Sequence, residues 1–139
     1  MKLQKNTLFA LYGVLESASQ PARQLSSGEI ARKYGISPHH LAKVLHTLAR
    51  AGVVESVRGV GGGYRFAGNA RRLTLMDVIA LFENIVPPAR SGAPRRRGAA
   101  GVERALGTVL AEIDAMAEAT LRSITIATLL KLVGRQRLS

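Results

Sequence analysis

The stretch SSGEIARKYGISPHHLAKVLHTLARAGVVESVRGVGGGYRF, at residues 26–66, decides the fold of this chain. It predicts two short helices joined by a tight turn and followed by a β-hairpin. Ser26 and Glu29 have the spacing of a capping box at the start of the first helix. Gly35 is suited to end that helix in the left-handed conformation. This order of elements is that of a winged helix-turn-helix, in which the hairpin is the wing.

The second helix of the stretch is expected to have one buried face and one polar face. Ser37 and Pro38 suit its N-cap and its first helical position. Its apolar positions have helical spacing: Leu41, Val44, Leu45 and Leu48. On or beside the opposite face we expect His39, His40, Lys43, His46, Thr47 and Arg50. Such a helix suits the major groove of DNA, because one face is anchored and the other can donate hydrogen bonds. An ordinary amphipathic surface helix is the alternative, which the preceding helix and turn disfavour.

The hairpin is expected at Val53–Arg58 and Tyr64–Ala67, around a turn in which four of five residues are glycine. Glycine-rich loops also hold phosphates of nucleotides, but there the glycines open a helix, whereas Tyr-Arg-Phe follows here. A glycine tip flanked by arginines suits close approach to the minor groove of DNA. The wing residues that we expect at the DNA are Arg58, Gly61, Gly62 and Arg65.

The composition narrows the class of protein. The chain has 139 residues and a formal net charge of +11, which favours nucleic acid or an anionic membrane as partner. No apolar run is long enough to cross a membrane. The apolar residues near the N-terminus are periodic, so we expect a helix of a cytoplasmic protein there rather than a signal peptide. The absence of cysteine excludes disulfides, thiol catalysis and Cys-ligated metal clusters. The three histidines share one helix without a metal-site motif, so we expect no enzyme activity, metal or cofactor.

Two further helices are predicted around this stretch. Residues 6–18 are predicted to form an amphipathic helix. Its apolar face is expected to carry Leu8, Leu11, Tyr12, Leu15 and Ala18. Thr74 and Asp77 match a second capping box, which opens a helix near residues 75–84. Its apolar side is expected to carry Leu75, Val78, Ile79 and Phe82.

The C-terminal part of the sequence predicts a long helix whose apolar face must be buried against another surface. Residues 85–100 contain prolines and four arginines without an acid, so we interpret them as a flexible basic loop, for which contact with DNA stays an alternative. A helix of about 19 residues follows, with a heptad-like apolar seam. The seam residues are Val102, Leu106, Val109, Leu110, Ile113 and Met116. This helix either packs on its own domain or pairs with a second copy in a dimer, and we favour the dimer. Residues 123–133 form a last short apolar segment, expected on the partner or on the first helix.

The fold class is therefore mainly α with a small β-hairpin. Residues 1–84 are expected to form the winged helix-turn-helix domain, 85–100 the loop, and 101–139 the dimerisation helix with a short terminal helix. The resulting hypothesis is a homodimeric, sequence-specific DNA-binding regulator without a cofactor. The rival hypothesis is a winged helix that binds a protein partner instead.

The segments IARKYGISPHHLAKVLHTLARAGVVESVRGVGGGYRFA, TLMDVI and SITIATLL resemble the Rrf-type family of bacterial transcription regulators, which includes IscR, NsrR, RirA and CymR. The resemblance implies a homodimer whose two winged helices bind a pseudo-palindromic operator. We expect this regulator to be a repressor. It places His39, His40 and Lys43 at positions that contact bases or phosphates, and Arg58 at the arginine that enters the minor groove. Many members hold an iron–sulfur cluster through three cysteines in the loop before the dimerisation helix. The corresponding loop here, PPARSGAPRRRGAA, has none, so the chain resembles a cysteine-less branch. A small ligand, a partner protein or no effector at all stay open.

Overall fold

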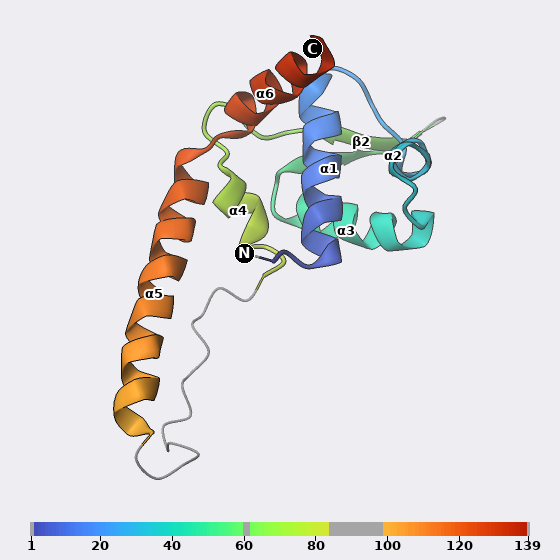
Figure 1. Cartoon of the computed structure of the whole chain (residues 1–139). Helices are drawn as coiled ribbons and strands as arrows, with labels where there is room; N and C mark the ends of the chain where they lie inside the picture. Colours follow the sequence, from blue (N-terminus) through green and yellow to red (C-terminus); the bar gives the residue numbers. More distant parts are fainter. Residues whose placement is uncertain (1, 60–61, 84–98, 139) are drawn as a thin grey trace.

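The computed structural model describes residues 2–59, 62–83 and 99–138. The helices and strands follow in the order α1 (Lys5–Ser19), α2 (Ser27–Tyr34), α3 (Pro38–Arg50), β1 (Val54–Val57), β2 (Gly63–Phe66), α4 (Leu75–Ile79), α5 (Ala100–Ser123) and α6 (Ile126–Leu138). Helices α1 to α4 and the hairpin form one packed body, which we call the N-terminal unit (Figure 1). Helix α5 extends away from it, and α6 returns to cover one end of α1 (Figure 1). The fold is mainly helical with one two-stranded hairpin, as the sequence predicts.

The helix-turn-helix forms where the capping residues predict it. The Ser26 side chain accepts a hydrogen bond from the backbone N–H of Glu29 at 3.1 Å. The Glu29 carboxylate contacts Arg23 at 3.4 Å. The return bond of a capping box, from the Ser26 backbone N–H to the Glu29 carboxylate, is not formed, so only one of the two expected bonds is present. Gly35 ends α2 with a φ of 64°, a conformation that glycine adopts without steric cost. Ser37 is the N-cap residue of α3 but its side chain makes no capping bond, and Pro38 begins the helix.

The apolar face predicted for α1 is wrong in part. Leu8 is exposed, and the fully buried face instead includes Thr7, Ala10 and Val14. The reason is the close packing of α1 on α3: a Cβ added to Gly13 would lie only 3.2 Å from the Leu45 side chain. Small residues therefore occupy the contact, and the larger apolar side chains of α1 pack beside it, partly buried.

The hairpin is anchored to the chain before α2. Strands β1 and β2 pair antiparallel, with Val54 opposite Phe66 and Val57 opposite Gly63. Tyr64 also exchanges two backbone hydrogen bonds with Leu25, at 2.8 and 2.7 Å. Strand β2 is thus bonded on both sides, to β1 and to Leu25.

The junction before α6 is likewise built from backbone hydrogen bonds. The Leu75 N–H donates to the Ile124 carbonyl at 2.9 Å, and the Ile126 N–H donates to the Leu73 carbonyl at 2.8 Å. The predicted capping box at Thr74 and Asp77 is present with both of its bonds, at 2.9 and 3.2 Å. Helix α4 nevertheless ends at Ile79 rather than near residue 84, because turns follow it up to residue 83.

Helix α5 is longer than predicted, with 24 residues, and the N-terminal unit does not cover its apolar seam. The six seam residues are all exposed, between 52% for Val109 and 69% for Met116. Packing of this seam on its own N-terminal unit, the alternative considered from the sequence, is therefore wrong. The predicted basic loop at 85–100 lies outside the described residues except for its last two. Helix α6 docks on α1 of the same chain, one of the two positions expected for it.

Candidate nucleic-acid interface

Helix α3 presents a polar face above a fully buried one. Its apolar stripe has exposed fractions of at most 2%: Leu41, Val44, Leu45 and Leu48. On the other side the exposed residues are His39, His40, Lys43, His46 and Arg50, whereas Thr47 is half-buried. The Thr47 hydroxyl donates to the Lys43 carbonyl at 3.3 Å, so it is engaged within the helix. The face offers imidazole, ammonium and guanidinium groups, which are donors suited to base edges and phosphates.

His40 differs from the other side chains of this face, because α1 holds it. Its Nε2 lies 2.5 Å from Oδ1 of Asn6, and its ring meets Phe9 edge-on, with ring centroids 5.4 Å apart. His40 thus joins the start of α3 to the start of α1. Sequence reasoning missed Asn6 and Phe9 because they lie more than 30 positions before His40, and no local pattern connects them.

The wing places its two predicted arginines differently. Arg58 is exposed directly after β1. Arg65 lies opposite Glu55 in the strand register, and its Nε donates to the Glu55 carboxylate at 2.8 Å. An exposed pair of this kind stabilises a fold by only about 0–1 kcal/mol, so DNA phosphates can compete for Arg65. Of the predicted tip glycines, Gly62 is exposed, and Gly61 lies outside the described residues.

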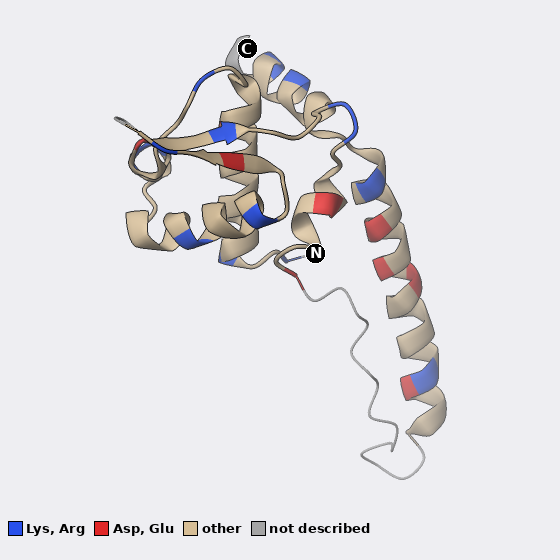
Figure 2. Cartoon of the chain, turned by 180° about the vertical axis from the view of Figure 1, so that it is seen from behind, with Lys and Arg blue, Asp and Glu red and all other residues tan. Residues whose placement is uncertain are grey.

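The charges of the chain are unevenly placed. Figure 2 shows basic positions on α3 and on the hairpin, on the side of the molecule remote from α5, and several acidic positions along α5. Positively charged side chains attract the negative phosphates of DNA over about 8 Å at physiological salt. The basic residues of α3 and the hairpin therefore favour an approach of DNA to this side of the molecule.

No helix within the described ranges is long and apolar enough to cross a membrane.

Comparison with known proteins agrees with this geometry. Residues 3–132 match the Rrf2 family, described as "Iron-dependent Transcriptional regulator". BadM of Rhodopseudomonas palustris (strain ATCC BAA-98 / CGA009), named as an HTH-type transcriptional regulator, is 53% identical over 137 residues, which are 99% of this chain and 86% of that protein.

Solved structures share the fold along nearly the whole chain. IscR of T. potens superposes with a TM-score of 0.75 at 25% identity, over 96% of this chain and 88% of IscR. CymR (YrzC), the global cysteine regulator of B. subtilis, gives a TM-score of 0.75 at 24% identity, over 95% and 98% of the two chains. At that identity the likeness to CymR concerns the fold alone.

The residues present do not fit the iron in the family's description. Protein ligands of iron are mainly cysteine, histidine and carboxylate side chains. The chain has no cysteine, and its three histidines all belong to α3. Across residues 2–59, 62–83 and 99–138, no three His, Cys, Asp or Glu side chains gather into a possible metal site.

The family consists of regulators and not of enzymes, and the match spans most of the sequence. The winged helix-turn-helix and the long α5 are shared with solved members of it. This chain belongs to the Rrf2 family of transcriptional regulators.

Proposed function

We propose that this regulator is a homodimer that binds a pseudo-palindromic operator through α3 and the wing, and that it acts as a repressor without an iron–sulfur cluster. A protein that reads chromosomal DNA in a bacterium acts in the cytoplasm. The observation that carries the proposal is the exposed donor face of α3, which stands on a stripe of fully buried leucines and valine. Lys43 and Arg50 supply positive charge on that face, and the histidines supply further donors.

The exposed seam of α5 supports the homodimer. Six large apolar side chains on one helix, each more than half exposed, form a surface that a soluble domain rarely leaves in water. The heptad-like spacing of the seam suits a second helix with the same spacing. A second copy supplies such a helix, and the resulting two-fold symmetry places two α3 helices on two half-sites.

The role of repressor is proposed because a DNA-binding face and a dimer interface are sufficient for it. A repressor needs only to occupy its operator, whereas an activator must also contact the transcription machinery. The described residues supply a DNA-binding face and a dimer seam, and the donor chemistry of the chain does not fit a cluster. In this proposal, residues 1–84 bind DNA and residues 101–139 form the dimer.

Titration of the DNA upstream of its own gene tests the proposal. Lys43→Ala and Arg58→Ala are each expected to weaken binding by about 1–3 kcal/mol. Lys131→Ala and Arg135→Ala remove the same charges from exposed positions on α6, and they serve as matched controls that should change affinity much less. Equal losses in all four variants would show attraction by the overall charge rather than contacts of α3 and the wing. No retardation of this DNA together with a stable co-purifying protein would favour the rival role as a protein-binding module.

A further inference from the structure

The ring of His40 is held in one orientation, although its side chain is exposed. Its Nε2 lies 2.5 Å from Oδ1 of Asn6, and the ring meets Phe9 edge-on, at an interplanar angle of 88°. The first contact fixes one nitrogen of the ring, and the second fixes the plane of the ring. An exposed side chain without such contacts samples several rotamers. Helix α1 therefore orients the ring of His40 in the free protein.

The first turn of α1, which carries Asn6, is itself fixed. The Glu83 carboxylate accepts two hydrogen bonds at Oε1, from the backbone N–H of Gln4 at 2.7 Å and from the Thr7 hydroxyl at 3.0 Å. Thr7 is fully buried. These bonds tie the start of α1 to the segment that follows α4, so Asn6 stands on an anchored turn.

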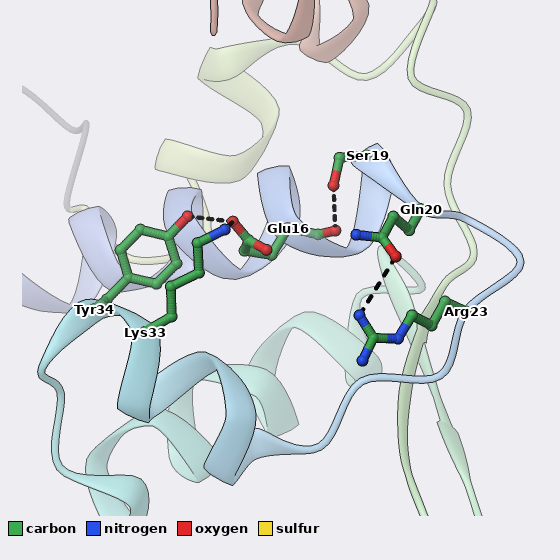
Figure 3. Close-up of polar contacts among 6 residues, drawn as sticks. All are labelled: Glu16, Ser19, Gln20, Arg23, Lys33 and Tyr34. Carbon is green, nitrogen blue, oxygen red and sulfur yellow. Dashed lines mark hydrogen bonds and ion pairs between the residues drawn. The ribbon is translucent and has the colours of Figure 1, made fainter. Parts of the chain in front are cut away.

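The rest of α1 is tied to the helix-turn-helix. Figure 3 shows Lys33 and Tyr34 of α2 reaching the Glu16 carboxylate of α1, which accepts a hydrogen bond from each of them. Near the middle of α1, Gly13 packs closely against the side chain of Leu45 on α3. The start of α1 therefore keeps its position relative to α3, and Asn6 is a firm support for His40.

The partner atom decides which nitrogen of His40 carries the proton. An amide oxygen only accepts hydrogen bonds, so Nε2 must donate and carries the hydrogen. In the neutral imidazole the other nitrogen, Nδ1, then only accepts. Within the described ranges of the chain, Nδ1 of His40 has no hydrogen-bond partner. A DNA phosphate does not suit this nitrogen, because the phosphate oxygens are acceptors as well.

We propose that Asn6 is a positioning residue that makes Nδ1 of His40 an acceptor for a base amino group in the major groove. The amino groups that donate there are N4 of cytosine and N6 of adenine. His40 therefore selects these bases on the strand that it contacts, and it disfavours guanine and thymine, whose edges offer only acceptors and a methyl group. Lys43 and Arg50 on the same face only donate, so α3 combines both kinds of contact. The tautomer is a property of the free chain, whereas the base preference rests on the proposed function.

Nitrogen NMR of the full chain without DNA tests the tautomer. Long-range ¹H–¹⁵N spectra of the imidazole rings at alkaline pH show which nitrogen carries the proton, and His40→Gln assigns the signals of His40. We expect the proton on Nε2 in the wild-type chain. Asn6→Leu removes the amide at similar size and favours helix, so both tautomers of His40 should appear. The signals of His39 and His46 should stay unchanged, which shows that α3 remains folded.

Gln4→Leu is the matched control for this spectrum. It removes an exposed amide from the same end of α1, and the Gln4 side chain makes no capping bond. The control should keep the wild-type tautomer of His40. A proton on Nδ1 in the wild-type chain, or an unchanged tautomer in Asn6→Leu, would overturn the proposal.

The base contact is tested with DNA that the wild-type chain selects from a random-sequence pool. Each adenine or cytosine of the selected half-site is replaced in turn by N6-methyladenine or N4-methylcytosine, which still pair but lack the amino hydrogen in the major groove. At one position this change should weaken binding of the wild-type chain by about three- to tenfold, the effect of one hydrogen bond. The same change should alter the affinity of His40→Ala by less than about twofold, as a double-mutant cycle requires of a direct contact. Asn6→Leu should show an intermediate loss, and Gln4→Leu the wild-type loss.

The two experiments separate the tautomer from DNA binding. If methylation affects the wild-type chain and His40→Ala equally at every position, His40 accepts no base amino group and the proposal is wrong. If the pool yields no bound DNA while Nε2 carries the proton, the proposed function fails and the positioning of His40 by Asn6 stands.

Discussion

Replacement of Gly63 by alanine is expected to detach the wing from the N-terminal unit. A Cβ at this position would lie 2.4 Å from the Leu25 carbonyl oxygen and 2.8 Å from its carbon. Both are backbone atoms, so no side-chain rotation relieves the overlap. The strand must move away from Leu25, and the two hydrogen bonds between Leu25 and Tyr64 are then lost.

The size of the effect follows from these contacts. Two backbone hydrogen bonds contribute about 1–3 kcal/mol together. Leu25 is only 4% exposed, and partial exposure of its side chain adds about 1 kcal/mol, a fraction of the full value for leucine. The free energy of unfolding should therefore fall by about 2–4 kcal/mol, which lowers Tm by roughly 5–15 °C for a chain of this size.

Thermal and urea unfolding of the pure protein measure this change. Gly101→Ala is the control, because a Cβ there meets no atom within 4 Å and alanine favours helix. It should keep or slightly raise the stability. If Gly63→Ala unfolds at the same Tm and urea midpoint as the wild-type chain, the wing is not held by Leu25 as described.

Three further predictions concern the core, the dimer and the cofactor. Leu45→Ala should lower the free energy of unfolding by about 2–5 kcal/mol in a urea titration, because Leu45 is 1% exposed. Ile113→Glu should give monomers in light scattering, whereas Ala115→Glu, on the opposite side of α5, should leave the dimer intact; a dimer in both would place the interface elsewhere. Protein purified without oxygen should show no absorbance band above about 320 nm, since thiolate ligands of an iron–sulfur cluster are missing. A brown preparation would contradict that expectation.

The sequence predicts the elements near glycines, prolines and capping residues most closely. Gly35, Pro38 and Thr74 stand where the helices end or begin, because local backbone chemistry decides these positions. The buried stripe of α3 also follows its pattern, since leucine and valine have only one neighbouring core to enter.

The buried face of α1 could not be predicted in the same way. Periodicity favours the face with the largest apolar residues, but α1 crosses α3 at a distance that admits only small side chains. The contacts of His40 with Asn6 and of Arg65 with Glu55 are likewise set by packing of distant segments. Spacing within one helix or strand carries no information about such partners. Most residues predicted at the DNA are exposed, and their role stays a prediction, while the intramolecular partners of His40 and Arg65 emerge only from the tertiary structure.

The junction between α5 and α6 bears on how a signal can reach the DNA. Residues 124–127 are tied to residues 70–75 by backbone hydrogen bonds, and Ile126 between them is fully buried. Backbone bonds are directional, so this junction fixes the direction in which α5 leaves the N-terminal unit. In a dimer formed through α5, the distance between the two α3 helices then depends on a rigid joint, and operator half-sites one turn apart tolerate little change in it.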